Sequence, residues 1–259
     1  MVRRRMLILV LLAIAAIAAA APASYAQTTP AAAAPATANA VDPASVQALK
    51  DMGAYLQTLK HFQVSTEVTG ERVLADGQKL QHTASAKLDV ARPNKLRAVM
   101  RSPRSQRDLV YDGKAVTLYA PGPKYYSTVE FTDTLGGLID QLEARYAVQI
   151  PLSDLFVWGT PAAKTDNIES AMNAGQDIIG GEVCDHYAFR QSAVDWQIWI
   201  ATGAKPLPRK IVITNRGDEA RPQSVTMLSW NLKPTFTEAT FKFTPPAGTR
   251  VIDTAKLGK

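Results

Sequence analysis

The side chains that could do chemistry are few and scattered in this sequence. Its 259 residues include one cysteine and three histidines, His61, His82 and His186. Cys184 and His186 are two residues apart and would share one face of a strand. A thiolate beside an imidazole could bind a soft metal or act as a nucleophile. Tetrahedral zinc needs three or four ligands, and no further ligand pair or orienting group is visible. We therefore expect a buried cysteine, no metal and no cofactor.

Other catalytic signatures are absent from the sequence. It contains no G-x-S-x-G elbow, H-E-x-x-H helix, phosphate-binding loop or G-x-G-x-x-G turn. The formal charge is +6, of which the three N-terminal arginines supply half, and the remaining Lys and Arg are scattered. Because no basic stripe forms, we expect no nucleic-acid partner. The sequence favours a protein that is not an enzyme.

The N-terminus predicts export. Arg3, Arg4 and Arg5 precede an apolar run over 6–20, and Ser24-Tyr25-Ala26 offers a small-x-small cleavage pattern. The run is shorter than the ~20 apolar residues that span a bilayer. We therefore expect a cleaved signal peptide over 1–26 and a periplasmic protein. Residues 27–42, rich in Ala and Pro, are typical of a flexible linker.

The elements that must position any site follow from hydrophobic periodicity. Asp42-Pro43 predicts the start of an amphipathic helix that runs to about Leu59. From Phe62 the period changes to two, and Asp76-Gly77 predicts a hairpin turn. Further strands follow to about 129, a second helix covers 135–146, and strands return from 176 to a last one at 239–243.

This order predicts an α+β fold over residues 43–257. About a dozen strands without βαβ alternation should form a single curved antiparallel sheet, because a sheet of that many twisted strands curls. If the helices cover the concave side as a lid, the result is a half-open β-barrel. Alternation in the segment 194–200 puts Trp196 and Ile198 on one face and Trp199 on the other. The first face either packs as core or lines an apolar cavity.

Ten residues are candidates for the lining of such a cavity. They are apolar residues on the predicted inner faces of strands, or on the second helix, and a one-residue register slip would invert the strand choices. They are Phe62, Val64, Leu88, Val90, Val116, Leu118, Leu138, Leu142, Trp196 and Ile198. A void of ~300 Å³ or more under the second helix would favour a ligand cavity over a filled core.

Taken in order, several segments resemble an uncharacterised family of predicted periplasmic proteins with a fold like the LolA/LolB lipoprotein carriers. The segments are Arg92-Pro93-Asn94-Lys95-Leu96-Arg97, Tyr111-Asp112-Gly113-Lys114, Ile150-Pro151-Leu152-Ser153-Asp154-Leu155-Phe156, Cys184-Asp185-His186-Tyr187-Ala188-Phe189, Asp195-Trp196-Gln197-Ile198-Trp199-Ile200, Pro206-Leu207-Pro208-Arg209-Lys210 and Phe241-Lys242-Phe243-Thr244-Pro245-Pro246-Ala247-Gly248. The resemblance implies a half-barrel with a helical lid over an apolar interior that holds acyl chains.

Three functions remain open. The first is a periplasmic binding or carrier protein for a lipid or other amphiphile, since acyl chains gain ~0.8 kcal/mol per buried CH₂ without any catalytic group. Its partners would be lipid or lipoprotein acyl chains and envelope proteins, and we expect a monomer. The second is a non-enzymatic interaction domain of the cell envelope with a filled core. The third is a hydrolase that uses scattered carboxylates.

Overall fold

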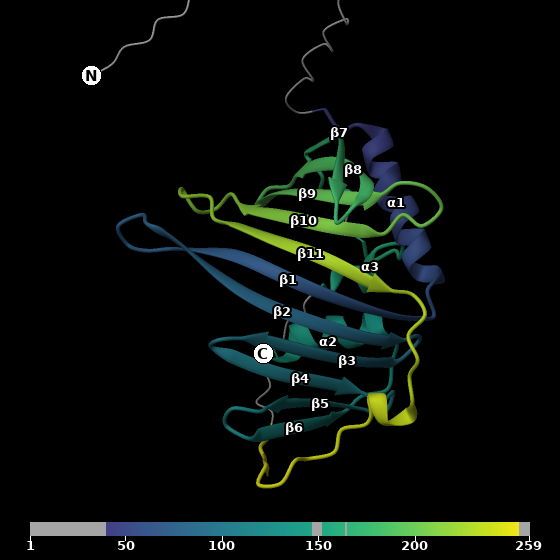
Figure 1. The fold of residues 1–259 in the computed structure, drawn as a ribbon, viewed down its shortest axis with the longest axis vertical. Coiled ribbons are helices and arrows are strands. Elements are labelled where there is room, and N and C mark those ends of the chain that lie inside the picture. Colours follow the sequence, from purple (N-terminus) through teal and green to yellow (C-terminus); the bar gives the residue numbers. More distant parts are fainter. Residues whose placement is uncertain (1–39, 147–151, 164, 254–259) are drawn as a thin grey trace, which may run out of the picture. The chain divides into compact units, whose positions relative to one another are not determined.

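Twelve strands pair into one sheet in the part of the chain that the structure describes (Figure 1). The structure is a computed structural model that describes residues 40–146, 152–163 and 165–253. These residues belong to the compact unit Thr37–Lys259, which we describe by itself. The expected signal peptide, most of the expected linker and the end of the expected domain lie outside the described residues.

Most neighbouring strands of the sheet follow each other in the sequence; the exceptions are the pairs β1–β11 and β12–β6. Its order is β12-β6-β5-β4-β3-β2-β1-β11-β10-β9-β8-β7, antiparallel throughout except for the parallel β12–β6 pair. The strands are β1 His61–Val73, β2 Lys79–Ala91, β3 Lys95–Ser102, β4 Ser105–Tyr111, β5 Ala115–Ala120, β6 Tyr125–Glu130, β7 Ser170–Ile179, β8 Glu182–Arg190, β9 Val194–Ala201, β10 Pro208–Asn215, β11 Gln223–Asn231 and β12 Arg250–Val251. The expected single, curved and open antiparallel sheet is confirmed.

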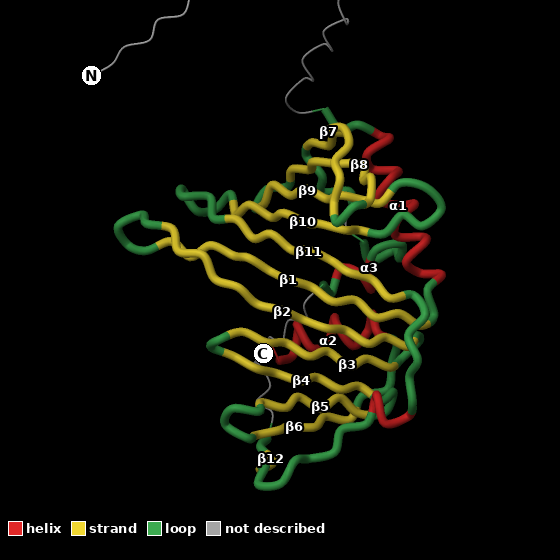
Figure 2. The backbone as a smooth tube through the Cα atoms, in the orientation of Figure 1, coloured by secondary structure: helices red, strands yellow, loops and turns green. Residues whose placement is uncertain are grey.

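The helices α1 Pro43–Thr58, α2 Leu135–Tyr146 and α3 Asp154–Val157 lie against the same face of the sheet. In Figure 1, α2 lies behind β2 and β3, and in Figure 2 the helices are the red segments beside the yellow sheet. We call this the concave face and the opposite one the outer face. The expected helical cover on the concave side is confirmed.

The start of α1 forms as the sequence predicts. The Asp42 carboxylate accepts hydrogen bonds from the backbone N–H groups of Ala44 and Ser45, each at 3.1 Å, and Pro43 occupies the first turn. The helix buries Leu49, Met52 and Leu56 against the sheet. Just before it, the Asp42 N–H donates to the Ala171 carbonyl on β7 at 3.0 Å, so the chain covers part of the β7 edge.

The end of the chain differs from the expectation. The sequence predicts a strand over residues 239–243, but Glu238–Phe241 form a 3₁₀ helix, and the rest is loop (Figure 2). The N–H of Thr237 donates to the Thr240 hydroxyl at 3.1 Å, which favours the turn over an extended chain. Phe243 then packs between the rings of Tyr119 and Tyr126. Alternating apolar residues here serve aromatic contacts and not a strand.

Candidate functional site

The concave face carries one continuous hydrophobic core. All ten residues expected to line a cavity belong to it or pack against it. Eight are buried: Phe62, Val64, Leu88, Val90, Val116, Leu138, Leu142 and Ile198. Leu118 and Trp196 are partly exposed. The structure therefore brings all ten together, with most of them packed between sheet and helices; whether any contacts a ligand remains a prediction.

α2 is fixed at its start by a buried tyrosine. The Tyr111 hydroxyl donates to the Asp133 carbonyl at 2.6 Å and accepts from the Asp133 N–H at 3.0 Å. Tyr111 itself is fully buried. From there α2 turns Leu135, Leu138 and Leu142 toward the sheet, as its helical spacing predicts. The covering helix is thus anchored to the sheet through both apolar and polar contacts.

α1 and the turn after α3 approach each other through two glycines. A Cβ on Gly53 would lie 2.4 Å from the Gly159 nitrogen, and Gly159 has a φ of +80°. The Gln57 side chain donates to the Trp158 carbonyl at 2.6 Å beside this contact. Any larger residue at either glycine would push the two helices apart, so Gly53 permits close packing.

Toward one end of the strands the concave face is no longer covered. Residues two apart on a strand lie on the same face. On β3, β5, β9 and β10, a buried residue of the concave face is followed, two positions closer to the β1–β2 hairpin turn, by a residue that is partly or fully exposed. The buried residues are Ala98, Val116, Ile198 and Ile211, and their outer neighbours are Met100, Leu118, Trp196 and Ile213. We call these last four the apolar strip.

Trp196 is the largest side chain of the apolar strip. Its ring stacks on Phe189 with centroids 4.3 Å apart, and it pairs with Ile213 across the strands. Its indole Nε1 is buried and has no hydrogen-bond partner among the described residues. A buried indole N–H usually finds an acceptor, so Trp196 departs from the usual pattern.

A cleft of about 600 Å³ opens at the other end of the concave face, where α2 begins. Apolar walls come from Leu135 and Phe156, which are both part of the core. Its polar lining includes Lys60 and Arg92, from the segments that flank β1 and β2. None of the ten expected residues lines this cleft.

Sequence reasoning missed Arg92, whose place in the Arg92-Pro93 turn gave no sign of burial. Its Nε and Nη2 atoms are buried without a hydrogen-bond partner among the described residues. Its guanidinium carbon lies 6.0 Å from the centre of the Phe62 ring and 5.7 Å from that of Phe156. Burial lowers the pKa of Arg92 from its ordinary value, because desolvation penalises the charged form.

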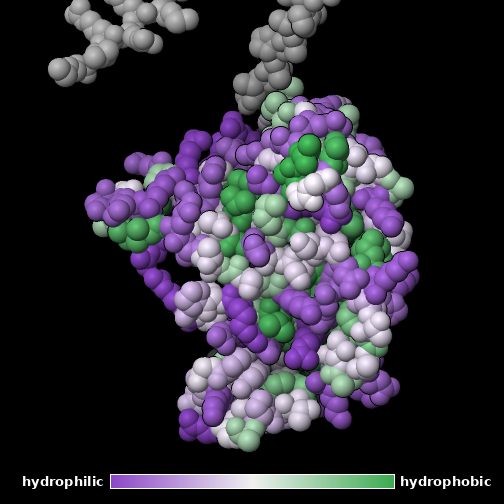
Figure 3. Space-filling model, in the orientation of Figure 1, coloured by the Kyte–Doolittle hydropathy of each residue, from purple (hydrophilic) through white to green (hydrophobic). Residues whose placement is uncertain are grey.

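Other clefts lie on the outer face and at the hairpin tips. One of about 370 Å³ is lined mainly by outer-face residues of β1, β2, β3 and β11, and another of about 710 Å³ separates the β1–β2 hairpin from the β3–β4 turn. Figure 3 shows this side of the molecule as mostly hydrophilic, with separate hydrophobic residues. Such a surface suits contact with water better than contact with acyl chains.

The Cys184–His186 pair lies on the outer face, where both side chains pack beside Trp199. Cys184 is buried in a small cluster with Trp199, and burial raises the pKa of its thiol, which disfavours the thiolate. His186 stacks on Trp199 with centroids 4.0 Å apart, and its Nε2 lies 2.9 Å from the Gln197 side-chain oxygen. Lys210 lies over the same indole at 4.3 Å. Within the described residues, no three His, Cys, Asp or Glu side chains gather as metal ligands.

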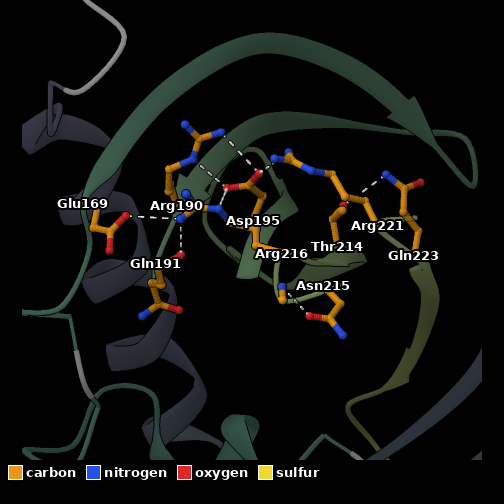
Figure 4. Close-up of polar contacts among 10 residues, drawn as sticks. Glu169, Arg190, Gln191, Asp195, Thr214, Asn215, Arg216, Arg221 and Gln223 are labelled. Carbon is orange, nitrogen blue, oxygen red and sulfur yellow. Dashed lines mark hydrogen bonds and ion pairs between the residues drawn. The ribbon is translucent and has the colours of Figure 1, made fainter. Parts of the chain in front are cut away.

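A charged network ties strand ends together on the outer face (Figure 4). Asp195 on β9 accepts hydrogen bonds from Arg190 on β8 at 2.7 and 3.2 Å, and Arg216 and Arg221 lie 3.7 and 3.9 Å from its oxygens. Arg216 also pairs with Glu169 at 3.2 Å. The hydrogen bond from Arg190, with the other two arginines, lowers the pKa of Asp195. The arginines are therefore engaged in holding the strands.

Fold and site together define a half-open antiparallel barrel with helices on its concave face and apolar surface at its interior. The chain belongs to the family described as predicted periplasmic protein (DUF2092), whose model matches residues 45–255. This confirms the resemblance seen in the sequence, and the family's description gives the periplasmic location expected from the N-terminus. The search of curated proteins found no match. Among the described residues, no helix has the length and apolar character needed to cross a membrane.

Solved structures with a similar chain path are distant in sequence. An uncharacterised conserved protein from Thermus thermophilus is 14% identical, with a TM-score of 0.48, over 81% of this chain and 99% of that one. The lipoprotein LppX from Mycobacterium tuberculosis is 13% identical, with a TM-score of 0.48, over 75% and 98%. A LolA superfamily protein from Nitrosomonas europaea is 10% identical, with a TM-score of 0.35, over 77% and 97%. At these TM-scores the likenesses carry no conclusion about a ligand.

Proposed function

We propose that this protein binds an amphiphile by its acyl chains on the concave face and carries it in the periplasm. The observation that carries the proposal is the apolar strip, where the core surface continues uncovered on the adjacent strands β9 and β10 and, in the other half of the sheet, on β3 and β5. Acyl chains laid on such a surface gain about 25 cal/mol per Å² of apolar area removed from water. No catalytic group is needed for this chemistry.

The packed region beneath α2 supports the alternative of an interaction domain with a filled core. Leu88, Leu138 and Ile198 are fully buried there by other parts of the chain. The two functions differ in what occupies the apolar strip: acyl chains in the carrier, and a protein surface or water in the interaction domain. A binding measurement at the strip therefore separates them.

Two tryptophans on β9 provide the measurement. Trp196 belongs to the apolar strip, whereas Trp199 lies on the outer face three residues further along. We would titrate the protein with 9,10-dibromostearate, whose bromines quench tryptophan on contact, and with unbrominated stearate as the optical control. The variants Trp196→Phe and Trp199→Phe form a matched pair.

A carrier should show saturable quenching by the brominated acid alone. The quenched fraction should fall in Trp196→Phe and persist in Trp199→Phe, because of these two indoles only that of Trp196 lies on the concave face. Absence of quenching in the wild-type protein, or an equal loss in both variants, would reject binding at the apolar strip and favour the interaction domain.

A further inference from the structure

A partly buried arginine borders the core beside α2, with no counter-charge paired with it among the described residues. Arg92 follows β2 directly, and its backbone N–H donates to the Lys60 carbonyl at 2.8 Å, which holds the residue against the α1–β1 junction. The Nε and Nη2 atoms are buried and unpartnered among the described residues. Buried charges in proteins are almost always paired with an opposite charge, because an unpaired one loses its hydration without return.

Among the residues that the structure describes, none pairs with Arg92 in this way. The cleft of about 600 Å³ is lined by Gln57, Lys60, Arg92, Pro93, Thr134, Leu135, Gly136, Phe156 and Thr160, which include two cations and no acid. An acidic group at this end, Asp133, is engaged at the start of α2, where its carboxylate accepts from the Thr134 N–H at 2.6 Å. The formal positive charge in the lining of the cleft comes from Lys60 and Arg92.

The walls around the guanidinium are apolar or aromatic. Phe62 and Phe156 flank it, and Leu135 and Phe156 continue into the core that also holds the concave-face residues. A guanidinium presents N–H donors in a planar fork that matches a carboxylate or phosphate group with two parallel hydrogen bonds. The cleft thus offers an anion site at the edge of an apolar interior.

We propose that this cleft binds the anionic oxygen headgroup of an amphiphile, a carboxylate or a phosphate, on Arg92 with assistance from Lys60. The identity of the ligand as an amphiphile rests on the proposed function, whereas the anion site rests on Arg92 alone. An anionic ligand would provide the acceptor that the buried donors lack. Uncharged lipids of the same chain length should bind less tightly.

The test compares one acyl chain with and without its charge. We would titrate the full protein with 9,10-dibromostearate and with its uncharged methyl ester, and follow the total tryptophan quenching. The variants are Arg92→Gln and, as a milder change at an exposed site, Lys60→Gln. The matched control is Lys87→Gln, which removes a cation from the outer face of the same sheet. A urea unfolding curve confirms that each variant is folded.

Wild-type protein should bind the acid at least about tenfold more tightly than the ester, since hydrogen bonds to a charged group correspond to a factor of about 10–100. Arg92→Gln should remove that difference, because it should weaken binding of the acid and leave binding of the ester unchanged. Lys60→Gln should reduce the difference in part, and Lys87→Gln should leave it unchanged. A difference that persists in Arg92→Gln would overturn the site.

The experiment distinguishes a failure of the anion site from a failure of the carrier function. If wild-type protein binds acid and ester equally, the anion site is wrong while the carrier stands. If neither lipid binds, the carrier fails, and a ³¹P titration with inorganic phosphate decides the anion site. Phosphate binding that Arg92→Gln abolishes would identify a free anion as the ligand, whereas no phosphate binding would overturn the anion site as well.

Discussion

Replacing Arg92 with methionine should stabilise the unliganded protein, although the change removes a charge and hydrogen-bond donors. Methionine replaces the arginine side chain as far as about its Nε, and its flexible thioether fills irregular apolar space between rings such as Phe62 and Phe156. The backbone hydrogen bond from residue 92 to Lys60 is retained. The variant therefore replaces a partly buried cation, two of whose nitrogens lack a partner among the described residues, by a shorter apolar side chain.

The size of the effect follows from the contacts of Arg92. The two buried, unpartnered nitrogens each cost about 1–3 kcal/mol. Two cation–π contacts at 6.0 and 5.7 Å are near the outer limit of that interaction, so each returns about 0.5 kcal/mol. The net expectation for Arg92→Met is a gain of about 1–5 kcal/mol in the free energy of unfolding.

Urea unfolding at pH 7 in a buffer free of phosphate and carboxylate measures this gain directly. A rise in the midpoint at constant slope reports a true increase in stability. Lys60→Met serves as the control, because an exposed lysine should change stability by less than about 0.5 kcal/mol. A loss of more than about 1 kcal/mol in Arg92→Met would show that Arg92 is satisfied in the folded chain, and the reasoning would be refuted.

Three further outcomes are expected. Leu138→Ala should lower the free energy of unfolding by about 3–5 kcal/mol, because Leu138 is fully buried between α2 and the sheet; a urea curve showing under about 1 kcal/mol would mean that α2 is not packed there. Cys184 should resist iodoacetamide at pH 8 in native protein and react after unfolding, since its thiol is buried and its pKa is raised; rapid native alkylation, read by mass spectrometry, would contradict this. Asp195→Asn should cost about 1 kcal/mol at pH 7, given its hydrogen bonds to Arg190. Because the folded-state pKa of Asp195 is lowered, its contribution is present above the unfolded pKa of about 3.9 and is lost as the pH falls through the folded value; a gap between wild type and variant that stays constant down to pH 2 would exclude the ion pair.

Local signals in the sequence were sufficient to predict most helices, strands and turns. Asp42-Pro43 begins α1, and Gly77 adopts the positive φ of +85° that the Asp76-Gly77 turn requires. Alternation places Trp196 and Trp199 on opposite faces, because side chains in a strand change sides at every residue. These features depend on neighbours in the chain, which a single sequence contains.

Features that depend on contacts between distant segments of the chain could not be predicted from the sequence. The burial of Arg92 depends on where α1 and α3 pack, and nothing in the Arg92-Pro93 turn encodes that. The apolar strip lies beyond the part of the sheet that the helices cover. Ile213 is therefore exposed and Ile211 buried, although the sequence pattern is the same for both. The predicted strand over residues 239–243 was wrong for a related reason: Phe243 contacts the rings of Tyr119 and Tyr126 and does not pair with a strand.

Native mass spectrometry of the protein purified from the periplasm tests the central claim most directly. Gentle ionisation should preserve a complex whose mass exceeds that of the chain by one or more amphiphiles, and activation should release them as anions. A spectrum containing the bare chain alone, from protein that also fails to take up added stearate, would contradict a carrier role for the concave face.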